Sequence, residues 1–197
     1  MPNIVVAFLS ALVLSPPPAG RAYSRLDRLP TDSEWVALAT TCRQARVPPD
    51  SGMILEMLET EREAGLPDAV RGLSLAAACI ESGFNPMARG DRRGSHYRAH
   101  GILQLWPWAE SLHGVDRDDP LVATRFYAER VLAAYAVVAR ECRYPGTWDR
   151  FGLSRDERLW AAAEARAVRG PGKADCYTVT AHYRLWLRWR RALSSAD

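Results

Sequence analysis

An uncharged run of small and apolar residues, Leu73-Ser74-Leu75-Ala76-Ala77-Ala78-Cys79-Ile80, ends directly at an acidic residue, Glu81. Because the run has no polar face, it predicts a helix that is buried on every side. Gly83 is suited to end this helix, which places Glu81 in the last turn. Burial and the unpaired carbonyl groups of that turn both oppose ionisation of a carboxyl group. We therefore expect Glu81 to be held protonated and able to donate a proton.

Two short blocks next to this helix resemble a known family. The first block is Glu81-Ser82-Gly83-Phe84-Asn85-Pro86, and the second is Gly101-Ile102-Leu103-Gln104-Leu105-Trp106-Pro107. Their order and separation are similar to those of two motif blocks in the soluble lytic transglycosylase domain, a lysozyme-like domain that cleaves peptidoglycan. The helix alone is equally compatible with a Glu81 whose side chain points into solvent and has no function. The two blocks favour a catalytic Glu81.

The resemblance implies a fold and a reaction. The fold would be an all-α, lysozyme-like multi-helix domain with a cleft, over residues 31–197. The reaction would be cleavage of the bond between N-acetylmuramic acid and N-acetylglucosamine, with Glu81 as general acid and then base, and with 1,6-anhydro ends as products. The partner would be the glycan strands of peptidoglycan, bound by a monomer. The family implies no cofactor and no metal.

Several further residues would bind the substrate in this interpretation, namely Ser82, Tyr97, Gly101 and Gln104. An amide group such as that of Gln104 offers both donors and an acceptor, which suits an N-acetyl group. Its alternative role is to satisfy nearby backbone groups. Trp106 and Trp108 follow in the sequence, and indole rings either stack on sugars or pack in the core.

The chain departs from the family's pattern near residue 166. The family has an Ala-Tyr-Asn-X-Gly block there, whose tyrosine supports the catalytic glutamate. This chain instead has Arg166-Ala167-Val168-Arg169 before Gly170-Pro171-Gly172. Either Tyr97, Tyr177 or Tyr183 supplies the support from elsewhere, or the site is altered.

Two other functions stay open. A hydrolase resembling goose-type lysozyme would need a second carboxylate to activate water, and Asp91 and Glu164 are the candidates. Each also has an ordinary role open to it, Asp91 as the cap of its own turn and Glu164 as an acid on a helix surface. The missing tyrosine and asparagine also allow a catalytically degenerate protein that only binds the cell wall.

The N-terminal segment has the features of an export signal. Residues 4–14 are apolar but too short to span a bilayer, and a segment rich in proline and small residues follows. We interpret residues 1–22 as a signal peptide and residues 23–30 as a linker, which predicts a periplasmic or extracellular protein. The first three residues lack a basic side chain, so a retained membrane anchor and a misassigned start are the alternatives.

Export to an oxidising compartment predicts that the four cysteines form two disulfides. Three pairings are possible. We favour Cys42 with Cys79 and Cys142 with Cys176, because each pair then joins neighbouring segments. The chain has no Cys-X-X-Cys pair and its histidines are scattered, which argues against a zinc site.

Capping signals and apolar periodicity predict helices over most of the remaining chain. A Thr31-Asp32-Ser33-Glu34 capping box begins a helix that runs to about residue 45. Asp50 or Ser51 caps a second helix, which Gly65 ends, and Pro67 is expected as the first residue of the third. Further helices are expected over about 120–142, 155–168 and 177–193. The basic segment over 90–100 is expected to be a loop, either one wall of a cleft, which we favour, or a mobile loop in solvent.

Charged side chains on two of these helices are expected to face water. On the second helix they are Glu56, Glu59, Glu61 and Glu63, and on the last they are Arg184, Arg188, Arg190 and Arg191. We expect the aromatic residues of the last helix to pack on the core. Interleaved basic and aromatic residues are also typical of nucleic-acid binding, but a net charge of only +3 and the export signal argue against it.

Overall fold

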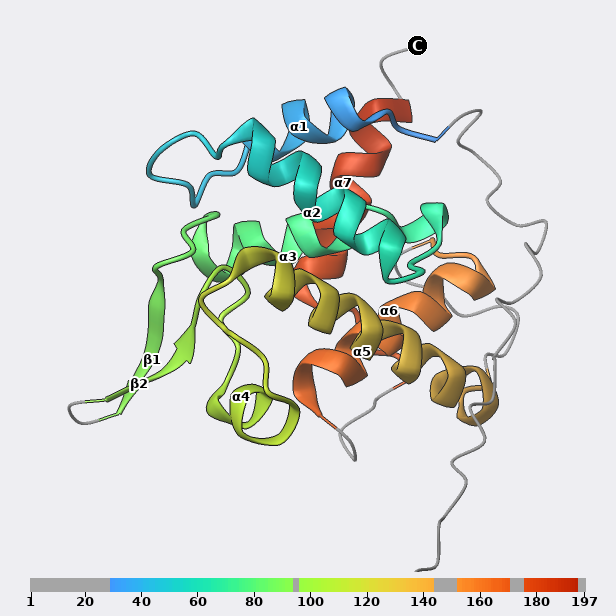
Figure 1. Ribbon diagram of the computed structural model, residues 1–197. Coiled ribbons are helices and arrows are strands. Elements are labelled where there is room, and N and C mark those ends of the chain that lie inside the picture. Colours follow the sequence, from blue (N-terminus) through green and yellow to red (C-terminus); the bar gives the residue numbers. More distant parts are fainter. Residues whose placement is uncertain (1–28, 94–95, 144–151, 171–175, 195–197) are drawn as a thin grey trace, which may run out of the picture.

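The computed structural model describes residues 29–93, 96–143, 152–170 and 176–194 of the 197-residue chain. Within these ranges it contains seven α-helices, one 3-10 turn and one two-stranded antiparallel sheet (Figure 1). The predicted helical class is confirmed, while the predicted signal peptide and most of the predicted linker lie outside the described residues. None of the helices in these ranges has the length and apolar character needed to cross a bilayer.

The elements follow one another along the chain from α1 near the N-terminus to α7 near the C-terminus. They are α1 Asp32–Thr40, α2 Ser51–Glu63, the 3-10 turn η1 Asp68–Val70, α3 Leu73–Ser82, β1 Arg89–Arg93, β2 His96–His100, α4 Pro107–His113, α5 Pro120–Glu141, α6 Arg155–Arg169 and α7 Ala181–Ser194.

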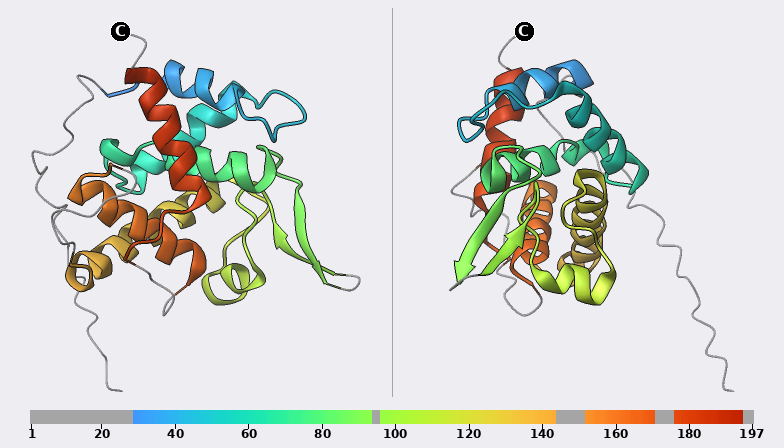
Figure 2. Two further views of the ribbon diagram at one scale, coloured as in Figure 1. Left: turned by 180° about the vertical axis from the view of Figure 1, so that it is seen from behind. Right: turned by 60° about the vertical axis from the view of Figure 1, so that its left-hand side comes forward.

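Helix α3 lies near the centre of the molecule. Helices α1 and α2 lie on one side of it, the α5–α6 pair lies on the other, and α7 packs against it (Figure 1, Figure 2). Every residue over 73–79 is buried, which confirms the expectation from the uncharged sequence. The β1–β2 hairpin projects from the side of the molecule at the C-terminal end of α3.

The start of α3 differs from the prediction. The helix begins at Leu73 instead of Pro67, because Gly72 has a left-handed φ of 81° that interrupts the helical path. Pro67 instead precedes the short η1 turn. The N–H groups of Gly72 and Ser74 donate to the carboxyl group of Glu61, across 2.6 and 2.7 Å.

Glu61 is therefore not on a solvated face, as we expected, but is fully buried. Burial raises the pKa of its carboxyl group, and the two backbone donors partly oppose that rise. Its role is to satisfy the first N–H groups of α3 and to fix α2 against it.

Two helix ends also differ, each for a local reason. α1 stops at Thr40 instead of about residue 45, because the hydroxyl groups of Thr40 and Thr41 donate to the carbonyls of Ala37 and Leu38. α7 begins at Ala181 instead of residue 177. The hydroxyl of Thr180 accepts the N–H of Tyr183 across 3.1 Å and caps the helix at that point.

The segment predicted as a loop over 90–100 is a β-hairpin. Arg89 pairs with His100, and Gly90 pairs with Ala99, in antiparallel register. The segment has no alternation of apolar and polar residues, so the sequence carries no strand signal.

The last helix confirms one expectation and corrects another. Tyr183, Trp186 and Trp189 are buried, as predicted. Arg190, expected in water, is only 6% exposed and donates to the carbonyl of Ala69 across 2.6 Å. Its guanidinium also lies 4.8 Å from the ring centre of Trp186, so the arginine helps to join α7 to the chain before α3.

Both favoured disulfides are confirmed. Cys42 is bonded to Cys79, and Cys142 is bonded to Cys176. The first joins the segment after α1 to α3, two residues before Glu81. The second joins the end of α5 to the segment that leads into α7.

Candidate active site

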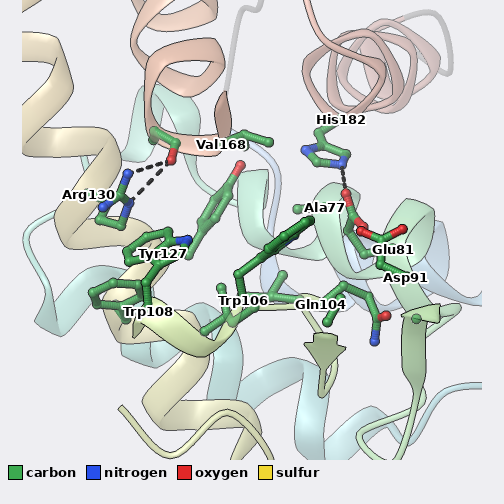
Figure 3. Close-up of a pocket in the computed structure, with 16 residues that line it drawn as sticks. Ala77, Glu81, Asp91, Gln104, Trp106, Trp108, Tyr127, Arg130, Val168 and His182 are labelled. Carbon is green, nitrogen blue, oxygen red and sulfur yellow. Dashed lines mark hydrogen bonds and ion pairs between the residues drawn. The ribbon is translucent and has the colours of Figure 1, made fainter. Parts of the chain in front are cut away.

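A pocket of about 400 Å³ lies where α3, the hairpin, α5, the end of α6 and α7 meet. In Figure 3, Glu81, Asp91 and Gln104 line one side, while Trp108, Tyr127 and Arg130 line the other, with Trp106 between them. The remaining lining residues are Ala77, Gly90, Ala99, Leu103, Leu105, Phe126, Ala167, Val168 and His182. The pocket therefore has a polar side that carries carboxyl groups and an opposite aromatic side.

Glu81 enters the pocket from the last turn of α3. Gly83 ends the helix in a left-handed conformation with φ of 61°, and a Cβ there would overlap the carbonyl oxygen of Gln44. The side chain of Glu81 is 32% exposed, so its surroundings are wetter than the apolar run predicts. Its nearest charged partner is a histidine that the sequence analysis did not single out.

That histidine, His182, lies between two carboxyl groups. Its Nε2 is 2.7 Å from Oε1 of Glu81, and its Nδ1 is 2.9 Å from Oε1 of Glu164. Burial alone would lower the pKa of His182, but hydrogen bonds and charge interactions with Glu164 and Glu81 outweigh burial and raise the pKa to about 9. The imidazole is therefore protonated at neutral pH, and both ring nitrogens donate.

Glu164 lies behind His182 and not on a helix surface, which corrects the ordinary role considered for it. It is fully buried and is not among the pocket-lining residues. Besides His182 it accepts the hydroxyl of Thr180, and it accepts the phenol of Tyr127 across 3.3 Å. Burial, together with the charge of Glu164, raises the pKa of Tyr127 well above its usual value and keeps the phenol a donor.

Asp91 is the second carboxyl group on the pocket wall (Figure 3). It lies in β1 between Gly90 and Arg92, both of which pair with β2. Its φ is 48°, a left-handed value that costs a non-glycine residue about 1 to 3 kcal/mol. Gln104, also on the pocket wall, has a φ of 47°. Strained backbone at two lining residues is typical of a functional site.

Gln104 lines the pocket, but its amide nitrogen is already engaged. Nε2 donates to the carbonyls of Gly101 and Ala88, across 2.8 and 3.2 Å. The backbone role that we considered as the alternative is thus present in the structure. Recognition of an N-acetyl group by Gln104 stays a prediction, and it would have to use the amide oxygen.

Ser82 and Gly101 lie next to the pocket and not in its lining. The hydroxyl of Ser82 donates to the carbonyl of Ile102 across 2.7 Å, which joins the end of α3 to the turn that carries Gln104. Gly101 has a φ of 76°, and a Cβ there would overlap the carbonyl oxygen of Arg117. Both residues therefore position the pocket walls.

Of the three tyrosines considered as a replacement support, the two whose side chains are described, Tyr177 and Tyr183, do not line the pocket. Tyr183 is a core residue and Tyr177 is exposed, while the side chain of Tyr97 lies outside the described residues. Tyr127 from α5 is the tyrosine that lines the pocket, and it reaches Glu81 only through Glu164 and His182.

The aromatic side of the pocket combines exposed and packed rings. Trp106 is 41% exposed, whereas Trp108 packs on Phe126 with ring centres 5.9 Å apart. The guanidinium of Arg130 lies 4.5 Å from the ring centre of Trp108 and donates to the carbonyl of Ala167. The pocket therefore offers a partly exposed indole, Trp106, and separately a cation held over the packed ring of Trp108, which suits a ligand that has both apolar faces and hydroxyl groups, such as a sugar.

His182 and Tyr127 are the site residues that the sequence analysis missed. For His182 a signal was present, because His182, Trp186 and Trp189 recur at helical spacing and place the imidazole on the apolar face of α7. For Tyr127 no local signal distinguishes it from the other apolar residues of α5.

Searches against family models, curated proteins and solved structures find no match for this chain.

Proposed function

We propose that this protein cleaves the bond between N-acetylmuramic acid and N-acetylglucosamine in peptidoglycan, as an exported lytic transglycosylase with a lysozyme-like fold. One observation carries the proposal: the two sequence blocks that resemble the family meet at one pocket. Glu81 from the first block and Gln104 from the second both line it, and Ser82 is hydrogen-bonded to Ile102 between them.

The reaction needs one carboxyl group that acts twice. Glu81 donates a proton to the glycosidic oxygen, which leaves as the hydroxyl group of N-acetylglucosamine while its bond to the muramyl C1 breaks. The resulting carboxylate takes the proton of the muramyl C6 hydroxyl as that oxygen bonds to C1. The 1,6-anhydro ring forms without water, and the C6 proton replaces the one that Glu81 gave to the leaving oxygen.

The pocket's shape and chemistry support this assignment. A volume of about 400 Å³ with an exposed Trp106 accommodates a sugar ring against an aromatic face. The two disulfides are typical of a protein that acts in an oxidising compartment, where peptidoglycan is found.

A hydrolase is the second candidate, and Asp91 is the observation that favours it. A second carboxylate on the wall of the pocket that holds Glu81 could activate a water molecule or stabilise the sugar cation. Glu164 does not fit that role, because His182 separates it from the pocket. The two candidates differ in their products, since hydrolysis leaves reducing ends and transglycosylation leaves anhydro ends.

The test is mass spectrometry of purified peptidoglycan after incubation with the protein. We expect soluble fragments that end in 1,6-anhydro-N-acetylmuramic acid. Fragments with reducing ends would identify the hydrolase instead. Binding of intact strands without any cleavage would contradict both enzymatic functions and support a cell-wall-binding protein.

A further inference from the structure

We propose that His182 and Glu164 form a proton relay behind Glu81, in which His182 transfers a proton to Glu81 when a glycan strand fills the pocket and recovers it after cleavage. This inference rests on the proposed function and adds a positioning residue, His182, that acts on the substrate through Glu81.

The relay is a line of three groups from three helices. Glu81 comes from α3, His182 from α7 and Glu164 from α6, and the two connecting hydrogen bonds are 2.7 and 2.9 Å long. The exposed fraction of the side chains falls along this line, from 32% at Glu81 to 7% at His182 and 0% at Glu164. The Glu81 end is therefore the end that meets solvent and substrate.

Glu164 is fixed as the inner end of the relay. It accepts from Thr180 and Tyr127 as well as from Nδ1 of His182, so each of these partners is a donor. A carboxylate surrounded by donors keeps a proton on Nδ1 and leaves Nε2 as the nitrogen that exchanges its proton.

The charged and titratable groups around His182 come from four elements. Glu81 from α3 and Glu164 from α6 contact the imidazole, Tyr127 from α5 contacts Glu164, and Arg130 from α5 and Asp91 from β1 line the same pocket. The two groups in direct contact with the imidazole are both carboxyl groups, so together they favour a proton on the ring.

Substrate binding provides the reason for the proton to move. A glycan strand in the pocket covers the exposed third of Glu81 and removes the water that stabilises its charge. The N–H bond of His182 Nε2 then breaks as an O–H bond forms on Glu81, and the charged pair becomes a neutral pair. The new hydroxyl turns to the glycosidic oxygen and donates its proton there.

The second half of the reaction restores the relay. The carboxylate of Glu81 accepts the proton of the C6 hydroxyl and returns it to Nε2 of His182. The proton that leaves on the product is thus replaced by the one from the C6 hydroxyl, none is taken from bulk water, and Nδ1 keeps its hydrogen throughout. An isolated glutamate, with an ordinary pKa of about 4.3, would instead be ionised at neutral pH and have no proton to donate.

The first test does not depend on activity. NMR spectroscopy of labelled imidazole side chains, from about pH 5 to about pH 10, follows the protonation of His182 in the wild type, Glu81→Gln and Glu164→Gln. We expect a wild-type midpoint near pH 9 and a lower midpoint in each variant, with His113 on α4 as an internal reference. A wild-type midpoint near 6.5, or one that neither variant changes, would overturn the relay.

The second test is the pH profile of peptidoglycan cleavage by the wild type, His182→Gln and Glu164→Gln. We expect each variant to lose activity at least tenfold at neutral pH and to lose progressively less as the pH falls, because acidic solvent can supply the proton that the relay no longer delivers. Glu141→Gln, an exposed acid on α5, is the matched control.

The two tests together distinguish a proton relay from a purely structural role of His182, and distinguish failure of the relay from failure of the proposed function. Circular dichroism first establishes which variants are folded, and a folded variant whose activity falls equally at every pH contradicts the relay. If the wild type cleaves no peptidoglycan, the proposed function fails. The NMR titration then still decides whether His182 shares its proton with Glu81.

Discussion

His182 donates from Nε2 to a carboxyl oxygen of Glu81 across 2.7 Å, although 101 positions of the chain separate the two residues. The contact depends on the packing of α7 against α3, which brings an imidazole to the last turn of α3 at the pocket. A carboxyl group that lines the pocket, with a protonated imidazole behind it, is the arrangement on which the proposed proton relay depends.

Glu164 is expected to be one of the most stabilising polar residues of the domain. Glu164→Ala leaves three buried donors without their acceptor, on His182, Thr180 and Tyr127. We expect a loss of about 3 to 5 kcal/mol in the free energy of unfolding, measured by denaturant titration. Glu141→Ala removes an exposed ion pair with Arg166 and should cost about 1 kcal/mol or less. Equal costs for the two variants would contradict this role.

The free energy of unfolding should decrease as the pH rises above neutral, because His182 then loses its proton. Its folded pKa of about 9 lies above the unfolded value of 6.5, so its contribution is complete below about pH 6.5 and is lost as the pH rises through about 9. The loss is on the order of 3 kcal/mol at most. Denaturant titrations across this range measure it, and in His182→Gln the slope should largely disappear. An unchanged slope in the variant would assign it to another group.

Gly101 is expected to tolerate no side chain. Gly101→Ala introduces a Cβ that overlaps the backbone carbonyl of Arg117, and its φ of 76° disfavours alanine as well. Gly65→Ala is the matched control, because its φ is 85° but nothing lies within 4 Å of the added Cβ. We expect a cost of about 1 to 2 kcal/mol at Gly65 and clearly more at Gly101. Thermal unfolding measures the loss of stability in each variant. A smaller loss at Gly101 than at Gly65 would contradict the close approach of the Arg117 carbonyl to Gly101.

Asp91 distinguishes the two enzymatic candidates. If the C6 hydroxyl is the nucleophile, Asp91→Asn should keep the cleavage rate within about tenfold of the wild type and keep anhydro ends, because no water has to be activated. If water is the nucleophile, the same change should lower the rate by about a hundredfold or more. The release of soluble fragments over time measures the rate, and their masses identify the ends.

Local signals predicted much of the fold correctly. The capping box at Thr31 marks a true helix start, Asp50 caps α2, and Gly83 ends α3. These features depend on residues within a few positions of each other, so they can be recognised without a structure.

Long-range contacts explain most of what the sequence could not predict. Four glutamates on α2 look alike, but Glu61 is buried because the N–H groups of Gly72 and Ser74 need an acceptor. Glu164 likewise depends on distant residues, because it accepts hydrogen bonds from Tyr127 on α5 and from Thr180 before α7. His182 on α7 contacts Glu81 on α3. The hairpin over residues 89–100 was missed because its strands have no apolar face to alternate.

The most direct measurement of the central claim is the yield of anhydro-terminated fragments from purified peptidoglycan, determined by mass spectrometry with equal amounts of wild type, Glu81→Gln and the exposed control Glu141→Gln. Glutamine keeps the shape of the side chain but has no acidic proton to transfer to the glycosidic oxygen. We predict abundant fragments from the wild type and the control, and at least a hundredfold fewer from Glu81→Gln. Similar yields from all three proteins would show that Glu81 is not the acid.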